Sequence, residues 1–159
     1  MSDFEFNIAK GRTLEFLWRV NNNDPAPSAL IVVLVKSAGL EADGTLKDYD
    51  TLSALLAGTT DECDFTNYAR KTLTDADVID PAPDDTNDRQ DGDIPDQTWT
   101  SAGGATNNTV GKLLICYDAD TGAGTDANII PLTAHDFVVT TDGTNLVAQV
   151  PTSGFFGAT

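Results

Sequence analysis

Catalytic side chains are scarce in this chain of 159 residues, which contains one His, two Cys and one Met. His135 is the single imidazole, and neither Cys63 nor Cys116 has a neighbour in sequence that would lower the pKa of its thiol. The sequence also lacks a glycine-rich phosphate loop and a His-Glu-x-x-His zinc motif. We therefore predict a protein that is not an enzyme and needs no cofactor.

Basic residues are equally scarce. Nine Lys and Arg stand against 25 Asp and Glu, so the formal net charge is −16. This charge would repel nucleic-acid phosphates and anionic membrane surfaces instead of neutralising them. We therefore predict no direct contact with nucleic acid or membrane. The same charge would keep the protein soluble when it is displayed in many copies.

Long apolar segments are absent as well. Leu30–Val35 is far too short to span a bilayer, and Met1–Glu5 has neither the basic nor the apolar region of a signal peptide. Without a secretion signal, Cys63 and Cys116 are expected to stay reduced and buried. A disulfide between these two cysteines is the alternative.

Asp and Thr are abundant, with 21 of each against only 4 Glu. Their short polar side chains compete for nearby backbone groups, so they favour turns, caps and strands over helix interiors. The charge is uneven, because residues 1–36 are neutral overall and no Lys or Arg follows Lys112. This indicates either a neutral face near the N-terminus and an acidic outer face, or strand content that leaves little room for acid.

The first half of the chain has the hydrophobic patterns of two strands and a helix. The nearly continuous apolar run at 29–35 predicts a strand buried on both faces. Apolar residues at helical spacing predict one short helix near Tyr49–Ala57, ending before Gly58. Residues 13–20 alternate between apolar and polar, which predicts a half-buried strand with its apolar side formed by Leu14, Phe16, Trp18 and Val20.

Short strands separated by turn residues fill the rest of the chain. Clusters of Gly, Asn, Asp and Thr lie between them, as in hairpins and short loops. We therefore predict a single mainly-β domain over residues 1–159, an antiparallel β-sandwich or barrel-like fold with one short helix and a long acidic loop. The further predicted strands are 65–73, 97–101, 110–117, 129–140 with a break near Pro131, and 145–150.

Two segments are expected to lie outside the core. Residues 75–96 contain nine Asp and one Arg, so we predict a solvated loop that tolerates replacement. Residues 151–159 form an apolar, glycine-rich tail that would be unusual to leave in water. Apolar aromatic side chains are enriched in protein interfaces, and our interface candidates from this tail and the less charged N-terminal region are Phe4, Phe6, Phe155 and Phe156.

Calcium is the one metal ion that the acidic segments could bind. Residues 118–126 form an Asp- and Gly-rich loop, and calcium binds hard oxygen ligands. The loop departs from a calcium helix-loop-helix, since Gly122 stands at the third acidic position and Ile129 at the twelfth. Turn-forming Asp and Gly are therefore the preferred interpretation, so we predict no metal site. The weak calcium candidates are Asp118, Asp120 and Asp126.

Neither His135 nor a pair of carboxylates gives a specific signal of catalysis. His135 and Asp136 are neighbours in a predicted strand, so their side chains would point to opposite faces of the sheet. We therefore interpret His135 as structural. A carboxylate pair of the glycosidase type has no specificity as a signal in a chain with 25 acidic residues.

A series of blocks in the second half of the chain resembles a known group of proteins. Residues 64–73 contain Phe-Thr-Asn-Tyr-Ala-Arg after a short helix and an acidic turn. A Trp-containing segment at 98–100, the run Leu-Leu-Ile-Cys-Tyr-Asp, the run Ile-Ile-Pro-Leu-Thr and a closing Gly-Phe-Phe follow in that order. This order, over roughly residues 46–157, is similar to that of small virion proteins of tailed bacteriophages. The resemblance implies a β-rich structural protein of the virion that is made in the host cytoplasm.

The resemblance leaves head decorations, head fibres and minor tail components open. We predict an exterior capsid decoration or minor capsid protein that forms homo-oligomers and binds the major capsid protein or tail proteins in many copies. The alternative is a tail-associated carbohydrate- or receptor-binding module, in which Trp18, Trp99 and Tyr117 would stack on sugar rings. An acidic mimic of DNA is disfavoured, because the carboxylates concentrate in one Pro-containing loop.

Overall fold

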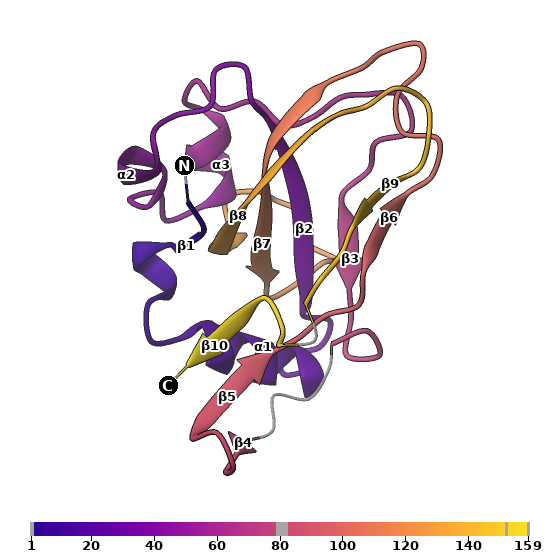
Figure 1. The fold of residues 1–159 in the computed structure, drawn as a ribbon. Coiled ribbons are helices and arrows are strands. Elements are labelled where there is room, and N and C mark those ends of the chain that lie inside the picture. Colours follow the sequence, from indigo (N-terminus) through magenta and orange to yellow (C-terminus); the bar gives the residue numbers. More distant parts are fainter. Residues whose placement is uncertain (1, 79–82, 152, 159) are drawn as a thin grey trace.

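The computed structural model describes residues 2–78, 83–151 and 153–158. Its largest sheet is antiparallel and has the strand order β1-β8-β7-β2-β3, while β10-β5-β4 and β6-β9 form two smaller antiparallel sheets (Figure 1). The predicted mainly-β antiparallel fold is therefore confirmed. The strands are β1 Phe4–Glu5, β2 Ala29–Lys36, β3 Lys71–Leu73, β4 Pro83–Asp84, β5 Arg89–Gly92, β6 Gln97–Trp99, β7 Thr109–Asp118, β8 Ile130–Thr140, β9 Leu146–Ala148 and β10 Phe156–Ala158. The helices are the 3-10 turn Asn7–Ala9, α1 Thr13–Asn21, α2 Asp43–Leu46 and α3 Leu52–Leu56.

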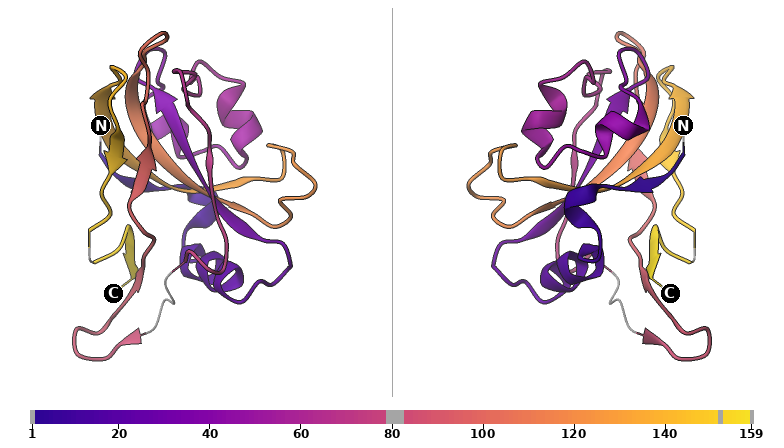
Figure 2. Two further views of the ribbon diagram at one scale, coloured as in Figure 1. Left: turned by 90° about the vertical axis from the view of Figure 1, so that its right-hand side faces the viewer. Right: turned by 90° about the vertical axis from the view of Figure 1, so that its left-hand side faces the viewer.

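Strands β2 and β7 form the centre of the large sheet because both of their faces are apolar. All of 29–35 and 110–118 are buried, which confirms the doubly buried strand predicted at 29–35. One face packs against Trp99 and α1, and the other packs against α2 and α3. Figure 2 shows the same arrangement, with α2 and α3 on one side of the sheet and β6 and β9 on the other.

Strand β8 continues through the predicted break near Pro131. The register of β8 against β7 shifts between Ile115 and Cys116, at the point where Cys116 lies opposite Pro131. Proline has no N–H to give to the ladder, so an irregularity at this position is expected. The break is therefore a bulge inside one strand, and it sets which face of the sheet each later residue of β8 occupies.

The strand predicted at 13–20 is wrong, because these residues belong to helix α1. The alternating pattern counted Trp18, whose side chain is 51% exposed, and left out the buried Leu17. Glu15 pairs with Arg19 one turn later, which supports the helix. The buried residues have the i, i+3, i+4, i+7 spacing of one helical face: Thr13, Phe16, Leu17 and Val20.

The helix predicted near Tyr49–Ala57 is present in a shorter form. It is α3, which begins where the Thr51 hydroxyl accepts a hydrogen bond from the N–H of Ala54. The apolar spacing that predicted it also included Leu46, which lies in the separate helix α2. The chain therefore has three α-helices among its described residues instead of the one that was predicted.

The acidic segment 75–96 is part of the fold and not a free loop. Strands β4 and β5 pair within it, and β5 also pairs with the C-terminal strand β10. Val78 and Ile94 are buried in the same hydrophobic core as α1 and Trp99. The predicted free loop is therefore corrected: most of its described side chains are exposed or half-buried, but Val78 and Ile94 anchor the segment in the core, so we now expect its replacement to be destabilising. Its residues 79–82 lie outside the described part of the chain.

The C-terminal segment is a strand and not a free tail. Phe156 lies opposite Gly92 in the β10–β5 pair, and the N–H of Phe155 donates to the Gly92 carbonyl at 2.9 Å. Gly154 turns the chain into this pair with a φ of +75°, and a Cβ there would collide with the Gly92 carbonyl. Only glycine accepts both the backbone conformation and the close approach.

The two cysteines lie on opposite faces of the large sheet. Both are free and buried, Cys63 in the core with α1 and Cys116 in the core with α2 and α3. Burial raises the pKa of the Cys63 thiol to about 12 and raises that of the Cys116 thiol as well. The prediction of reduced, buried cysteines is confirmed, and the alternative of a disulfide between them is wrong.

Candidate functional site

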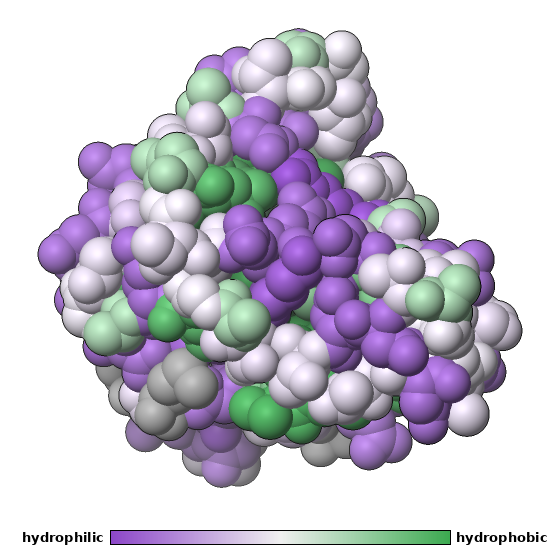
Figure 3. Space-filling model, turned by 90° about the horizontal axis from the view of Figure 1, so that it is seen from above, coloured by the Kyte–Doolittle hydropathy of each residue, from purple (hydrophilic) through white to green (hydrophobic). Residues whose placement is uncertain are grey.

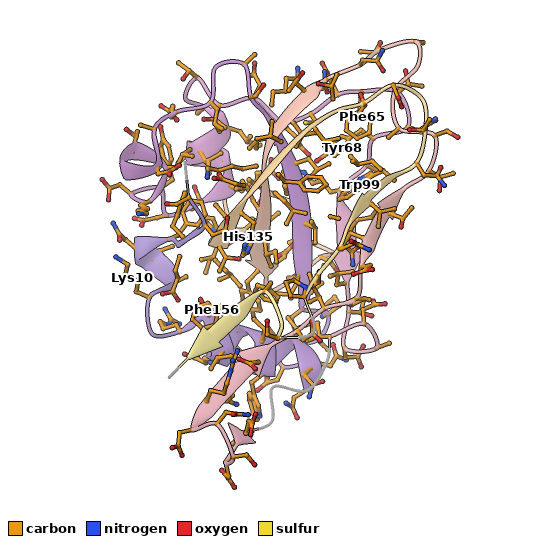
Figure 4. All side chains as sticks on the ribbon, in the orientation of Figure 1. Lys10, Phe65, Tyr68, Trp99, His135 and Phe156 are labelled. Carbon is orange, nitrogen blue, oxygen red and sulfur yellow. The ribbon has the colours of Figure 1, made fainter. Side chains whose placement is uncertain are left out.

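A hollow lies on the large sheet where the N-terminal and C-terminal strands come together. Two adjoining cavities of about 260 and 240 Å³ share Asp3, His135 and Phe155, and we call them together the His135 groove. Figure 4 shows His135 on β8 and Phe156 below it on β10. The apolar side chains of the larger cavity are Ile94, Leu113, Ile115, Phe137, Ala148, Val150 and Phe155, and those of the smaller are Phe4, Phe155 and Phe156.

The strand order brings these distant segments together. Strand β1 pairs with β8, with Phe4 opposite Ala134. Strand β10 is held by β5, whose neighbour Ile94 is buried in the core. Both ends of the chain therefore border the same stretch of β8. The groove depends on two long-range pairings, and no local pattern in the sequence encodes it.

His135 is held by side chains in front of it and beside it. Its Nδ1 lies 3.3 Å from Asp3 Oδ2, and its Nε2 lies 2.9 Å from the hydroxyl of Thr133. The ring meets Phe155 edge-to-face, with the ring centroids 6.2 Å apart. Both ring nitrogens thus have partners within the protein, which agrees with a structural histidine that shapes the groove.

A buried lysine holds the N-terminal segment next to the groove. Lys112 is fully buried, and its ammonium group donates to the carboxylate of Asp136 and to the Ser2 carbonyl at 3.1 Å. Asp43 Oδ1 lies 3.3 Å from the same ammonium, and Asp43 Oδ2 accepts from the N–H of Ser2 at 2.9 Å. We call Ser2, Asp3, Asp43, Lys112 and Asp136 the N-terminal clamp.

Two carboxylates of the clamp, Asp3 and Asp43, are stabilised in their charged form. Burial raises the pKa of Asp43, but the hydrogen bond from the N–H of Ser2 and the contact with Lys112 outweigh it, so the pKa lies below its usual value of 3.8. Burial likewise raises the pKa of Asp3, and the hydrogen bonds from the N–H of Asp136 and from His135 bring it below the usual value. Asp3 and Asp43 therefore stay ionised at neutral pH.

Three of the four predicted interface residues meet at the groove. Phe4, Phe155 and Phe156 line its smaller cavity, although the first is more than a hundred residues from the other two in the sequence. Phe6 does not reach it, because its ring is fully buried beneath α2 and α3. Phe6 is thus a core residue, and Phe4, whose side chain is only 9% exposed, is largely one as well.

The weak calcium candidates do not come together. Asp118 Oδ1 accepts from the N–H of Asp120, and Asp120 Oδ1 accepts from the N–H of Gly122, so these carboxylates shape a turn. Asp126 turns away from them and pairs with Arg70. Within the described ranges, His, Cys, Asp and Glu form no group of three or more with metal-binding geometry.

The aromatic residues considered for sugar binding are mostly unavailable. Trp99 and Tyr117 are buried, and the indole N–H of Trp99 donates to the Ala69 carbonyl at 2.8 Å. Trp18 on α1 is exposed. Trp18 is thus the one member of this set that presents its ring to solvent.

Lys112 is the residue beside the candidate site that the sequence did not point to. It stands among apolar neighbours in a strand whose remaining residues from 110 to 118 are also buried. A charged residue in such a run must find partners, because an unpaired buried charge is very costly. That signal was available in the sequence, but the partners Asp43 and Asp136 could be identified only from the fold.

A second charged cluster lies where the loop after β7 meets the chain before β3. Arg70 contacts Glu62 at 2.6 Å and Asp126 at 2.5 Å, and Tyr68 donates to Glu62 at 2.7 Å. Hydrogen bonding to Arg70 lowers the pKa of Asp126. Hydrogen bonding to Asp126 and Glu62 raises the pKa of Arg70. The cluster ties two loops together, and all three nitrogens of the guanidinium donate to carboxylates within it.

Arg70→Met is expected to lower the free energy of unfolding by about 1–3 kcal/mol at pH 7, since two partly buried carboxylates lose their partner. The pKa of Asp126 lies below its usual value of 3.8, so its stabilisation is complete above that pH and is lost as the pH falls further. The difference between the two proteins should therefore shrink at pH 3. Urea unfolding of the parent protein and of Arg70→Met at pH 7 and at pH 3 measures this difference in the free energy of unfolding.

The matched control is Arg19→Met, which removes the same charge from an exposed helical pair with Glu15. Such a pair contributes only about 0.3–0.5 kcal/mol. Equal losses of stability in both variants would show that the Arg70 cluster stabilises the fold no more than an exposed ion pair does.

The face of the molecule seen from above in Figure 3 is largely hydrophilic, with small hydrophobic areas separated by hydrophilic residues. Among the described residues, no helix is long and apolar enough to cross a membrane. The His135 groove is lined mainly by apolar side chains, and both nitrogens of its one histidine have partners, so its chemistry suits contact with another apolar surface.

Comparison with known proteins identifies no relative. No protein-family model matches the chain, and no curated protein or solved structure matches it either.

Proposed function

We propose that the chain is a non-enzymatic structural protein of a phage virion, and that it decorates the exterior of the capsid in many copies. The observation that carries this proposal is the convergence of Phe4, Phe155 and Phe156 on one groove. Phe4 is largely buried, whereas Phe155 and Phe156 are half-buried, and aromatic side chains at a hollow are enriched at the centre of protein interfaces. The groove thus provides an apolar contact for the shell.

The charge distribution supports the same proposal. The chain carries a net charge of −16, and its acidic hairpin β4–β5 extends from the end of the molecule opposite α2 and α3 (Figures 1 and 2). A strongly acidic surface keeps densely displayed copies soluble.

Phe156→Ala is expected to weaken the affinity of the protein for phage particles at least about tenfold, a loss of about 1.4 kcal/mol in binding free energy. The measurement adds purified protein to particles that lack it and quantifies the bound protein after sedimentation. The effect should persist in 1 M salt, because apolar burial is not screened. Val147→Ala, an exposed apolar residue outside the groove, is the matched control.

A point substitution is a sharper test than removal of residues 152–159. Removing that segment deletes strand β10 and its pairing with β5, so folding and binding would change together. Full occupancy of Phe156→Ala would show that the groove is not the contact. Failure of the intact protein to bind either heads or tails would contradict the virion proposal itself.

The alternative is a tail-associated module that binds a carbohydrate or receptor. The exposed ring of Trp18 is the observation that favours it, because a sugar ring could stack there. Binding to a glycan array that Trp18→Ala abolishes and Phe156→Ala leaves unchanged would support this alternative over capsid decoration.

A further inference from the structure

The smaller cavity of the His135 groove has two carboxylates in its lining. Asp3 and Glu5 come from the N-terminal segment, and Glu5 lies opposite Thr133 of β8. No Lys or Arg is among the described residues that line either cavity of the groove. The groove is therefore an apolar hollow with an acidic end, and a positive charge is the one that this end attracts.

Both carboxylates have acceptor positions left for a ligand. Asp3 accepts from the N–H of Asp136 at 2.8 Å and lies 3.3 Å from His135 Nδ1, and its side chain is still 63% exposed. Glu5 Oε1 accepts from the Thr13 hydroxyl at 2.6 Å. A carboxylate offers about four acceptor positions, so each group can take a further donor and keep the bonds that fix it.

Two aromatic rings of the same cavity are also suited to a cation. Phe155 and Phe156 are half-buried in its lining, and phenylalanine rings attract cations through their π electrons. Phe4 already has such contacts, because the ammonium groups of Lys47 and Lys112 lie 5.0 and 5.1 Å from its ring centroid. A further cation in the cavity would therefore meet the rings of Phe155 and Phe156.

The larger cavity has room for a side chain. Its volume of about 260 Å³ is below the about 300–1,000 Å³ of sites that hold drug-sized ligands. Its apolar walls adjoin the acidic end at Asp3, His135 and Phe155, which line both cavities. Lys and Arg bury an aliphatic stem along apolar surface while the charged head stays at a polar edge. A basic side chain next to an apolar one thus matches the groove in size and in charge.

We propose that the His135 groove binds a segment of the partner protein that carries a Lys or Arg next to an apolar side chain. The cationic head lies between the Asp3 and Glu5 carboxylates and the two half-buried rings, and the apolar side chain enters the larger cavity. This inference names the chemistry of the partner at the groove, so it rests on the proposed attachment to a particle. The net charge of −16 also attracts a basic segment from a distance.

A peptide titration tests the groove on the free, unaltered protein. The probe is acetyl-Gly-Leu-Arg-Leu-Gly-amide, and the comparison peptide has citrulline, which is uncharged and of nearly the same shape, in place of the arginine. We expect the arginine peptide to shift the nuclear magnetic resonance signals of Asp3, Glu5 and Phe156. The citrulline peptide should bind at least about fivefold more weakly, because it lacks the charge that both carboxylates contact.

Particle binding tests the same contact in the assembly. Asp3→Asn combined with Glu5→Gln removes both charges, while the amide carbonyls can still accept from the N–H of Asp136 and from Thr13. We expect this double variant to bind particles about tenfold more weakly than the parent protein in about 50 mM salt. In 1 M salt the loss should be less than about twofold, because charges are screened beyond about 3 Å.

The matched control is Asp50→Asn combined with Asp61→Asn, which removes two charges from exposed side chains outside the groove. This control should change the affinity for the arginine peptide and for particles by less than about twofold. Thermal melting of both double variants shows whether they are folded, and the comparison of the two peptides needs no variant at all.

Several results would overturn the proposal. The two peptides could bind equally well, neither could bind at about 10 mM, or the shifted signals could lie outside the groove. The Asp3 and Glu5 double variant could lose self-association instead of affinity for particles, in which case a second copy occupies the groove. If the intact protein binds no particles, the virion proposal fails, whereas the peptide titration still decides whether the groove takes a basic side chain. If Phe156→Ala alone weakens particle binding, the groove contact stands and the basic side chain does not.

Discussion

A variant in which residues 75–96 are replaced by a Gly-Ser linker of equal length is expected to melt about 10 °C or more below the parent protein. Val78 and Ile94 are buried in the core, and burial of a side chain of this size stabilises by about 1.5–3 kcal/mol. For a domain of this length each kcal/mol corresponds to about 2–4 °C. The variant also loses β5, the pairing partner of β10.

Calorimetry gives the melting temperature of the linker variant, which should be compared with that of a control variant altered at the tip of the same hairpin. Asp85 is exposed, and Asp88 has a φ of +50°, which glycine adopts without strain. Asp85→Ser combined with Asp88→Gly should therefore change the melting temperature by less than about 2 °C. A linker variant as stable as this control would mean that the segment is a solvated loop after all.

The acidic segment shows why its role could not be predicted from composition. Nine aspartates correctly indicate solvent exposure for most of the side chains, because buried carboxylates need partners. Two apolar residues are enough to fix the segment, however, when the long-range pairing of β5 with β10 holds it against the sheet. Composition averages over a segment, whereas a core contact depends on single residues.

The two central strands of the large sheet were predictable because burial on both faces leaves an apolar run. Residues 29–35 and 113–117 have that pattern, and they belong to β2 and β7. Helix α1 was not predictable by alternation, since Leu14, Phe16, Trp18 and Val20 fit a strand while Phe16, Leu17 and Val20 fit a helix. Which pattern applies depends on what covers the segment, and that is a property of the whole fold.

The candidate site could be predicted in its parts but not in its arrangement. Aromatic character nominated Phe4, Phe155 and Phe156, and the fold places all three around one hollow. The order β1-β8-β7 and the pairing of β10 with β5 bring them there. Neither pairing has a local sequence signal, because β1 and β10 are only two and three residues long.

Lys112→Met is expected to lower the free energy of unfolding by about 3 kcal/mol at neutral pH. The ammonium group of Lys112 is fully buried and lies between Asp43 and Asp136. Without it, two partly buried carboxylates face each other with no cation, and the Ser2 carbonyl loses its donor. Removing one member of a buried charged network costs far more than breaking an exposed pair.

The matched control is Lys36→Met, which removes the same charge from a pair whose acidic partner, Asp64, is mostly exposed. A loss of less than about 1 kcal/mol is expected there. Hydrogen exchange adds a local measurement: amides of Phe4 and Glu5 should exchange faster in Lys112→Met but not in Lys36→Met, because only the first variant releases the N-terminal clamp.

Neutralising the partners separates the charge of Lys112 from its packing. In the triple variant Lys112→Met, Asp43→Asn and Asp136→Asn, the ammonium group and the two carboxylates that contact it are removed together, and the side-chain carbonyl introduced by Asp43→Asn can still accept from the N–H of Ser2. We therefore expect this variant to recover at least half of the stability lost by Lys112→Met, since an apolar replacement of a buried ionic network is often close to neutral once both signs are removed. If the triple variant is as unstable as Lys112→Met, the ion pairs with Asp43 and Asp136 are not what stabilises the fold, and the packing of the lysine stem or the contact of its ammonium group with the Phe4 ring, 5.1 Å from the centroid, is.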